Sequence, residues 1–528
     1  MFKVFITDKL SDKGVAVFKA EPDFQADVFP TMTPEDLKKA IVDYDAIVIR
    51  SATTITPEIL AAAKKLKVIG RAGVGLDNVD IPAATRSGVI VMNTPDGNTI
   101  AAAEHTVALI LALARNIPQA HMSLKEKKWE RNKFTGVELY GKTVGIIGLG
   151  RIGFEVAKRL RAFNMNIMAF DPFCTPERAR TIDAELTTVD AILRQADFIT
   201  VHVPKTKETA NMIAAEQLKL CKKGARFINV ARGGIINEAD LAAAVHSGHI
   251  GGAAMDVFSE EPPTGNPLLD EDKIVVTPHL GASTEEAQVN VADVVAKQIV
   301  DALKGRTIAN AVNIASISAD LWKEIQPYYG LAGRLGAFAA QYLGGQLKSA
   351  EVHYLGEMAK KKTQALTPVL LQELLKPSFP ESVNLINVGI LAKERGIAIK
   401  EVSGGEGFFS TSIVLEAETA EGKHTIEAAL SGTEARIVGI DGFRVDIRTE
   451  GTLLLFFNQD KPGMVGKVAT ILGDAGVNIA SLTNGRAAKG GEALSVFCLD
   501  GTVKDEVAKK VGAIEGVRGV RIVALGQD

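Results

Sequence analysis

Short apolar runs alternate with helical periodicity through the first 280 residues, which is the pattern of parallel strands joined by crossover helices. In residues 1–97 the predicted strands are Lys3–Thr7, Ala46–Arg50, Val68–Arg71 and Val89–Asn93. Residues 140–280 repeat the rhythm with six predicted strands, at Thr143–Ile147, Ile167–Phe170, Phe198–His202, Arg226–Asn229, Ala253–Val257 and Ile274–Thr277. Two long helices, over Thr99–Asn116 and Thr284–Leu303, are expected to connect these segments, the second returning to the first segment.

The second half of the chain has a less regular pattern. Between 313 and 448, strands are predicted at Ala350–Leu355, Ile413–Glu418 and Ile437–Ile440, and helices at Thr367–Leu375 and Val383–Arg395, which is typical of an α+β module. Residues 451–528 follow the βαββαβ order of a ferredoxin-like sandwich. The predicted modules are therefore 1–97 together with 285–312, then 98–284, 313–448 and 449–528.

One turn in the second segment has the residues of a dinucleotide site. Gly148, Gly150 and Gly153 lie between an apolar run and a helical pattern, and Asp171 ends the next apolar run. Two glycines let the backbone turn tightly and approach a pyrophosphate, and the third lets the helix pack on the sheet. The helix N-terminus offers free N–H groups. Asp171 would accept hydrogen bonds from the adenosine ribose and repel a 2′-phosphate, so the pattern predicts a Rossmann domain, within an α/β protein, that binds NAD.

Composition argues against several kinds of partner. The 528 residues carry a formal net charge of −3, so no general attraction to nucleic acid or to an anionic membrane is expected. The longest apolar stretch, about 106–114, is too short to cross a bilayer. The N-terminus enters a strand pattern at once and leaves no room for a signal peptide. Three cysteines without ligand spacing predict a cytoplasmic location and no metal site.

Oxidation of an alcohol needs a base for the hydroxyl proton, placed beyond the carboxyl ends of the parallel strands. Among the eight histidines, His279 meets this requirement because it directly follows a predicted strand and opens a loop. Imidazole exchanges protons near neutral pH, although a hydrogen-bonded turn histidine is the structural alternative. His105 falls inside the long helix, and His202 lies within a strand, where it is expected to pack or to line the cofactor.

Two neighbouring strand ends add an arginine and a pair of acids. Arg232 precedes two glycines, so its guanidinium is free to bind a carboxylate in bidentate fashion; a surface salt bridge is the alternative. Glu260 and Glu261 follow the next strand, where a carboxylate can orient an imidazole, or simply be solvated. Asp256, near the end of that strand, is expected to face the nicotinamide amide. Arginine, acid and histidine thus follow three successive strands of one sheet.

Four motifs together resemble the D-isomer-specific 2-hydroxyacid dehydrogenases: Gly148–Gly153, Asn229–Gly234, Met255–Pro262 and Pro278–Gly281. The resemblance covers residues 1–312 and implies a flavodoxin-like substrate domain beside the Rossmann domain. It also implies that Arg232 binds the substrate carboxylate, that His279 is the acid and base, and that Glu261 pairs with it. Besides the glycines and Asp171, the residues assigned to the NAD site are Arg151, Ile152, Val203, Val230, Ala231, Arg232, Asp256, His279, Gly281 and Ala282.

Within this family, segments 49–53, 70–78 and 129–131 resemble the long D-3-phosphoglycerate dehydrogenases. This resemblance implies that Arg50, Arg71 and Asn98 contact the substrate and that Arg131 reaches a neighbouring subunit's site. A phosphate group needs such cations, whereas the first two arginines could instead be surface residues at strand ends. The implied reaction is the NAD-dependent oxidation of 3-phospho-D-glycerate to 3-phosphohydroxypyruvate, the first step of phosphorylated L-serine synthesis.

Two alternative functions stay open at this point. One is another D-2-hydroxyacid dehydrogenase, which would reduce glyoxylate, hydroxypyruvate or 2-oxoglutarate with the same catalytic residues. The other is a non-catalytic regulator that senses NAD with this fold. Arg50, Arg71 and Arg131, which the resemblance directs toward a phosphate group, argue against both alternatives.

The C-terminal module resembles an ACT domain, a ligand-sensing unit that pairs sheets side by side, through Asn458–Gly463 and Gly476–Ile479. The module before it resembles the intervening domain of the long dehydrogenases. Asp460 and Asn478 stand where ACT domains bind amino acids, so the resemblance implies L-serine as an allosteric effector. We also expect a homo-oligomer, with a tetramer as the hypothesis.

Overall fold

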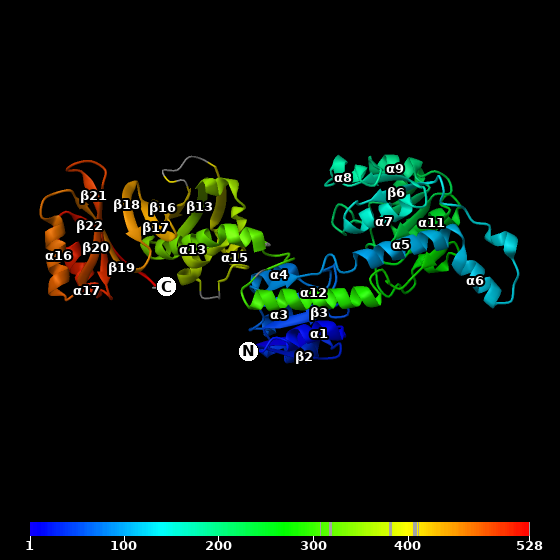
Figure 1. The fold of residues 1–528 in the computed structure, drawn as a ribbon, viewed down its shortest axis with the longest axis horizontal. Coiled ribbons are helices and arrows are strands. Elements are labelled where there is room, and N and C mark those ends of the chain that lie inside the picture. Colours follow the sequence, from blue (N-terminus) through cyan, green and yellow to red (C-terminus); the bar gives the residue numbers. More distant parts are fainter. Residues whose placement is uncertain (307, 316–318, 380–382, 405–408, 410, 527–528) are drawn as a thin grey trace.

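The described residues form four β-sheets that follow one another along an elongated molecule in the computed structural model (Figure 1). The structure describes residues 1–526 apart from 307, 316–318, 380–382, 405–408 and 410; the last two residues of the predicted C-terminal module lie outside this range. We call the first two sheets, with their helices, the first lobe and the NAD lobe. The α/β class predicted from the sequence is confirmed.

The first lobe contains a parallel sheet in the order β2-β1-β3-β4-β5, the flavodoxin order. Its strands are β1 Phe2–Ile6, β2 Phe24–Val28, β3 Ala46–Ile49, β4 Val68–Arg71 and β5 Ile90–Met92. Its helices are α1 Asp12–Lys19, α2 Pro34–Ala40, η1 Ile41–Asp43, α3 Pro57–Ala62 and α4 Ile81–Arg86. The edge strand β2 was not among the predicted strands, because only its first residue, Phe24, is buried.

The NAD lobe contains a seven-stranded parallel sheet in the order β12-β11-β10-β9-β6-β7-β8. Its strands are β6 Thr143–Ile147, β7 Asn166–Phe170, β8 Ala184–Leu186, β9 Phe198–Val201, β10 Arg226–Asn229, β11 Gly252–Met255 and β12 Ile274–Val276. Its helices are α7 Arg151–Arg161, α8 Pro176–Arg180, α9 Val189–Gln195, α10 Ala215–Leu220, α11 Glu238–His246 and η3 Pro267–Asp270. The six predicted strands are present, and the additional β8 is a short, half-exposed edge strand.

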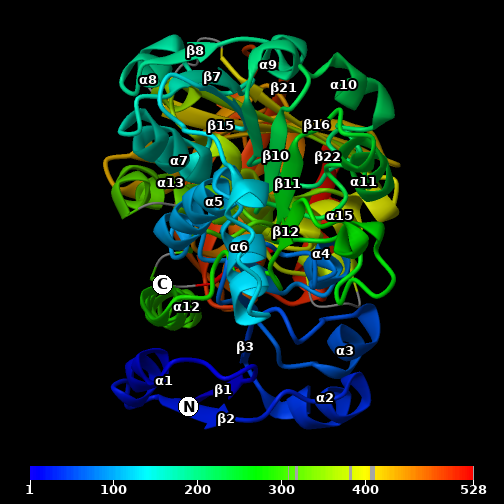
Figure 2. The ribbon, with the colours of Figure 1, turned by 90° about the vertical axis from the view of Figure 1, so that its right-hand side faces the viewer.

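The chain passes twice between the two lobes. At the first crossing it enters α5 (Thr99–Ala114), which packs on α7 and β11 of the NAD lobe. The predicted helix thus ends within two residues of its expected end, Asn116, which takes a left-handed conformation; α6 (Ile117–Lys125) and η2 (Arg131–Phe134), which were not predicted, then project outward (Figures 1 and 2). The second crossing follows β12 and leads into α12 (Glu285–Leu303), which packs on α1 and β4 of the first lobe. Both lobes are therefore joined near residues 97–99 and 281–284.

The third module is a six-stranded mixed sheet, β14-β13-β15-β16-β17-β18, covered by α13 and α14. Its strands are β13 Leu347–Gly356, β14 Ala398–Ser403, β15 Thr411–Thr419, β16 Lys423–Ser431, β17 Glu434–Ile440 and β18 Phe443–Arg448. Its helices are α13 Ala319–Tyr342, η4 Glu357–Lys360, η5 Thr363–Ala365, α14 Thr367–Leu375, η6 Lys376–Ser378 and α15 Val388–Glu394. The three predicted strands are present, and α14 coincides with the predicted helix Thr367–Leu375, whereas α15 occupies only the later part of the predicted helix Val383–Arg395. Strands β14, β16 and β18 and the long helix α13 were missed.

The fourth module is an antiparallel sheet, β20-β21-β19-β22, and its βαββαβ order confirms the prediction. Its elements are β19 Gly451–Gln459, α16 Met464–Asp474, β20 Asn478–Arg486, β21 Glu492–Asp500, α17 Asp505–Gly512 and β22 Val517–Leu525. One face of the sheet packs on α16 and α17, whereas Leu453, Leu455 and Val523 on the other face join the core of the third module. The Gln341 side chain of α13 also donates to the carbonyl of Ala524 and accepts from its N–H group. The third and fourth modules therefore share one hydrophobic core.

Three general features of the described residues bear on function. No single helix in the described range has the length and hydropathy of a membrane span; α5 and α6 reach such a composition only as a pair with a 63° bend between them. Cys174, Cys221 and Cys498 are free thiols. In the same range, acidic, histidine and cysteine side chains form no cluster that could hold a metal ion.

Candidate active site

A cavity of about 970 Å³ lies between the two lobes, at the carboxyl ends of both parallel sheets. The first lobe contributes the loops after β3 and β4, and the NAD lobe contributes the loops after β9, β10, β11 and β12. Most of the side chains that the sequence assigned to substrate and cofactor line this cavity: Arg50, Arg71, Asn98, Ile152, Val203, Val230, Ala231, Arg232, Glu261, His279, Gly281 and Ala282.

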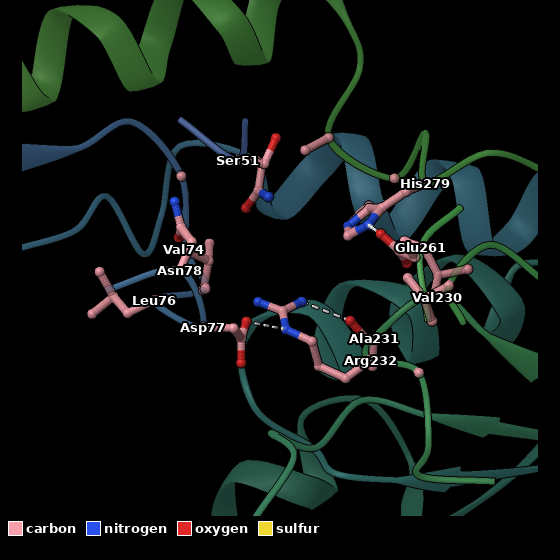
Figure 3. A pocket seen from close by; sticks show the side chains of 18 of the residues that line it. Ser51, Val74, Leu76, Asp77, Asn78, Val230, Ala231, Arg232, Glu261 and His279 are labelled. Carbon is pink, nitrogen blue, oxygen red and sulfur yellow. Dashed lines mark hydrogen bonds and ion pairs between the residues drawn. The ribbon is translucent and has the colours of Figure 1, made fainter. Parts of the chain in front are cut away.

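His279 and Glu261 form a pair on the wall of the cavity. The Nδ1 atom of His279 lies 2.8 Å from Oε2 of Glu261, and Oε1 of the same carboxylate accepts the N–H of Phe258 at 3.1 Å. Because Nδ1 is engaged, Nε2 is the ring nitrogen left for a substrate, and Figure 3 shows the imidazole facing the open centre of the cavity. The geometry is that of a base whose tautomer is fixed by a carboxylate.

Asp256 holds the loop that carries His279. Its fully buried carboxylate accepts from Thr277 Oγ1 at 2.6 Å and from the N–H groups of Leu280 and Gly281 at 2.7 and 2.8 Å. Nε2 of His105 lies 3.1 Å from the same carboxylate. Burial alone would raise the pKa of Asp256, but these hydrogen bonds outweigh it and hold the pKa below its usual value.

This network was missed by sequence reasoning, which passed over His105 because it lies within a helix. The buried carboxylate of Asp256 is absent from the residues that line the cavity, although the sequence suggested that it faces the nicotinamide. In this structure Asp256 instead supports the backbone around His279, which has a left-handed φ of 54°. A histidine in this uncommon conformation needs such external support.

Arg232 reaches across the cavity toward the first lobe. Its Nε donates to Oδ2 of Asp77 at 3.0 Å, and its Nη1 donates to the carbonyl of Ala231 at 2.6 Å (Figure 3). The guanidinium lies against the backbone of Gly75, where a side chain would collide with it. Asn229 secures the base of the loop, because its Nδ2 donates to the carbonyl of Arg232 at 2.8 Å.

Arg50 and Arg71 line the first-lobe side of the cavity. Burial, together with the neighbouring Arg232, lowers the pKa of Arg71 to about 10. Asn78 links the two arginines: its Oδ1 accepts from Arg71 Nε at 3.4 Å, and its Nδ2 donates to the carbonyl of Arg50 at 2.7 Å. Asp8, at the end of β1, accepts the N–H of Arg50 at 2.9 Å. The cationic wall is therefore braced by two residues to which sequence reasoning assigned no role.

Asn98 stands at the first crossing between the lobes. Its side-chain oxygen is buried at the cavity and has no hydrogen-bond partner among the described residues. A buried amide oxygen without a partner is costly, so a ligand hydroxyl or N–H group would be stabilised at this position.

The turn between β6 and α7 fits a dinucleotide. Gly148 has a φ of 98°, and a side chain there would meet the carbonyl of His202 at 2.5 Å. A side chain on Gly153 would collide with the carbonyl of Gly148, whereas Gly150 faces open space at the N-terminus of α7, without a side-chain cap. Asp171 accepts the N–H of Leu149 at 2.8 Å, at the tip of the next strand. A pyrophosphate on the free N–H groups and a ribose beside the acid suit this arrangement.

Two further residues of the NAD lobe lie near this turn. Arg151 forms an ion pair with Asp96, between their Nε and Oδ1 atoms at 2.6 Å, so it bridges toward the first crossing. His202 lines the cavity, and its removal from water lowers its pKa to about 4, so the ring is neutral at physiological pH. A neutral imidazole fits the predicted wall role and not that of a second cation.

The three predicted ligand residues not yet described also lie outside the lining of this cavity. Arg131 is exposed on η2, beyond α6. In the fourth module, Asp460 follows the end of β19, and Asn478 begins β20. Their partners on β21 place them at opposite ends of the sheet, so the chain does not bring these two side chains together. Asp460 accepts from the Gly490 N–H and from Arg486, which lower its pKa.

Comparison with known proteins identifies the modules. Residues 107–281 match the NAD-binding domain of D-isomer-specific 2-hydroxyacid dehydrogenases, residues 324–441 match the intervening domain of D-3-phosphoglycerate dehydrogenase, and residues 452–516 match the ACT domain. The crystal structure of D-lactate dehydrogenase from Aquifex aeolicus, complexed with NAD and lactic acid, superimposes with a TM-score of 0.54 and 26% identity. It covers 59% of this chain and all of the enzyme.

Full-length relatives extend the match to all four sheets. The D-3-phosphoglycerate dehydrogenase of Methanocaldococcus jannaschii is 43% identical over 526 residues, which covers 99% of this chain and 100% of the relative. That of Bacillus subtilis is 42% identical over 527 residues, with the same coverage. NAD is therefore the cofactor, and the chain belongs to the D-3-phosphoglycerate dehydrogenase family, within the D-isomer-specific 2-hydroxyacid dehydrogenases.

Proposed function

We propose that this chain oxidises 3-phospho-D-glycerate to 3-phosphohydroxypyruvate with NAD, as the first step of phosphorylated L-serine synthesis. The observation that carries the proposal is one cavity with two distinct ends. The pair His279–Glu261 and Arg232 lie on the NAD lobe, and Arg50 and Arg71 lie on the first lobe. Both full-length relatives compared above are named D-3-phosphoglycerate dehydrogenases, which supports the same reaction.

The chemistry assigned to the NAD lobe is a proton transfer beside a bound carboxylate. Arg232 would bind the substrate carboxylate in bidentate fashion and polarise the developing carbonyl. His279 would take the hydroxyl proton on Nε2, and Glu261 would stabilise the resulting imidazolium through Nδ1. The turn at Gly148 and the N-terminus of α7 would hold NAD, whose chemistry when bound would be the acceptance of a hydride from C2 of the substrate. In the reverse direction the same imidazolium returns the proton.

The chemistry assigned to the first lobe is phosphate recognition. Arg50 and Arg71 offer fixed guanidinium donors, and the unpartnered oxygen of Asn98 would accept from a substrate hydroxyl. Arg131 is exposed at the end of the projecting segment, and we assign it to the site of a neighbouring subunit. A phosphate with nearly two charges is the ligand that uses all of these groups.

The projecting segment supports a homo-oligomer. Large apolar side chains are exposed on and beside α6: Ile117, Met122, Leu124, Trp129 and Tyr140. Exposed apolar side chains gathered on one outward helix mark a protein contact, and a second copy of the chain would also bring in Arg131. We retain a homotetramer as the hypothesis, with a cytoplasmic location, because the cysteines are free thiols.

The ACT domain supports regulation by a small ligand, for which we retain L-serine. Because Asp460 and Asn478 lie at opposite ends of one sheet, a ligand that contacts both needs two copies of this module. An isolated module would therefore bind serine weakly. The test is serine inhibition of the full chain.

The reaction itself is tested with NADH and a panel of 2-oxo acids, by following the loss of NADH absorbance. We expect kcat/KM for 3-phosphohydroxypyruvate to exceed that for hydroxypyruvate by about a hundredfold or more, because each charged hydrogen bond to the phosphate is worth about 1.5–3 kcal/mol. Equal efficiency with both acids would reject the phosphate assignment. No turnover of any 2-oxo acid, with NADH bound, would favour an NAD-sensing regulator.

A further inference from the structure

The carboxylate of Asp77 lies where the structure gathers positive charge. Asp77 belongs to the loop after β4, on the first-lobe wall, and Arg232 belongs to the opposite wall. Their side chains point toward each other across the cavity (Figure 3), and the ion pair joins Nε of the guanidinium to Oδ2 of the acid at 3.0 Å. Arg232 is the residue to which the proposed function gives the substrate carboxylate.

The surroundings of this pair favour a carboxylate on Arg232. Gly75 leaves room for the guanidinium, and its missing side chain would also meet Oδ2 of Asp77 at 2.9 Å. Arg71 is close enough to Arg232 for the two positive charges to disfavour each other, and Asp77 opposes that effect. Without a ligand, Asp77 thus supplies a negative charge that pairs with Arg232 and favours the charged form of Arg71.

The acid has no structural role that would explain its position. Its side chain is 68% exposed, and Arg232 is the partner of its carboxylate in the described structure. An exposed ion pair adds little to the stability of a fold. The same pair is easily exchanged, because a carboxylate that arrives from solution offers the guanidinium the same oxygen atoms with better geometry.

We propose that Asp77 is an internal competitor for the carboxylate subsite: it occupies Arg232 in the empty cavity, and the carboxylate of the incoming hydroxy acid displaces it. The inference rests on the proposed function only in that Arg232 binds the substrate carboxylate. It does not depend on the assignment of the phosphate site. It gives Asp77 a role in specificity. A neutral ligand cannot replace the anion on Arg232, so the exchange selects for a carboxylate.

The test is Asp77→Asn in the full chain, with two readouts. The first is KM for 3-phosphohydroxypyruvate with NADH, and the second is calorimetric binding of oxamate, an unreactive 2-oxo acid analogue, to the NADH-bound protein. Without the competing anion, both KM and the oxamate Kd should fall about two- to fivefold, the range expected for an exposed ion pair. The KM for NADH should not change. Unchanged or weaker binding of oxamate would overturn the proposal.

A matched variant separates local competition from general charge. Asp43→Asn removes the same charge from the first lobe; this side chain is 65% exposed and pairs with Lys65, away from the cavity. It should leave both readouts unchanged. Inorganic phosphate, used as a competitive inhibitor, is the second control. If Asp77→Asn changes the inhibition constant of phosphate as much as the Kd of oxamate, the effect comes from the overall charge of the cavity, and the proposal is overturned.

The two hypotheses fail in different ways. If the wild-type chain does not reduce 3-phosphohydroxypyruvate, the proposed function fails and oxamate alone decides the role of Asp77. If oxamate binds the variant and not the wild type, Asp77 competes so strongly that it blocks the carboxylate subsite, and the proposal is supported. If oxamate binds neither protein, Asp77 is not what limits access to Arg232, and the proposal is overturned.

Discussion

His279 and Glu261 are joined by a contact of 2.8 Å between Nδ1 and Oε2, and both partners are fixed from behind. The second oxygen of Glu261 accepts the N–H of Phe258, and the loop of His279 is held by the buried carboxylate of Asp256. The imidazole of His279 therefore has Nδ1 engaged by Glu261, while its Nε2 faces the cavity, where a ligand would bind. This is the arrangement that a proton acceptor needs.

Replacement of His279 by Ala should lower turnover by roughly two or more decades, because general base catalysis contributes about 10²–10⁴-fold. NAD binding, followed by fluorescence titration with NADH, should stay within about twofold of the wild type. Near-normal turnover would remove His279 from the mechanism.

Replacement of Arg50 by Ala should raise KM for 3-phosphohydroxypyruvate about tenfold or more, because one charged hydrogen bond to the phosphate is lost. Hydroxypyruvate, which lacks the phosphate, serves as the internal control, and its kcat/KM should hardly change. An unmoved KM for the phosphorylated acid would place the phosphate elsewhere.

Replacement of Gly75 by Ala should displace Arg232 without unfolding the first lobe. The new methyl group collides with the end of a flexible guanidinium, which moves more easily than backbone. KM for phosphorylated and unphosphorylated 2-oxo acids should both rise about tenfold, since the shared carboxylate subsite is affected. Gly466→Ala, at an open position on α16, is the matched control. A selective effect on the phosphorylated acid would contradict the assignment of Arg232.

The partly buried ring of His202 predicts a pH dependence of stability. Its folded pKa is about 4, whereas an unfolded histidine titrates near 6.5. Between these values the unfolded state binds a proton that the folded state refuses, so stability falls as pH falls from about 6.5 to 4. At pH 5 the loss should be about 2 kcal/mol. The fall in unfolding midpoint from pH 7 to pH 5 should be smaller in His202→Asn, and an equal fall in both proteins would contradict the prediction.

The shared core predicts how the chain can be divided. A fragment of residues 451–528 exposes Leu453, Leu455 and Val523, so it should self-associate in analytical ultracentrifugation. A fragment of residues 1–315 should stay monodisperse or form the oligomer of the α6 contact, and should bind NADH. It keeps Asn313, whose side chain bonds the N–H of Val91 and the carbonyl of Val89. A monomeric, well-folded 451–528 fragment would show that the sheet face needs no cover.

The sequence predicted many of the residues that line the cavity because the informative residues follow directly after strands. Arg232, Glu261 and His279 each lie a few residues beyond a buried apolar run, and parallel strands bring such positions to one edge. The same reasoning missed Asp8, Asn78 and His105, which act through backbone atoms or through another side chain. Such partners become visible only when distant segments are placed in space.

Three of the strands that the sequence missed share a physical character. Strands β2, β8 and β14 lie at sheet edges and carry few buried side chains, so no apolar run marks them. Helix α6 was also missed, because the prediction ended the helical segment at Asn116, where the backbone turns left-handed, and did not resume it after that turn. The ion pair of Asp77 with Arg232 could not be predicted either, because it joins residues that are 155 positions apart in the sequence.

The second crossing between the lobes has one more consequence. His279 is followed within five residues by Thr284, whose hydroxyl caps α12, and α12 is packed on the first lobe. His279 therefore lies beside the segment that connects the lobes rather than deep inside one of them. We expect a rotation of one lobe against the other to shift the imidazole, so substitutions on α12 beyond Gln288 and Val291, which line the cavity, should change kcat.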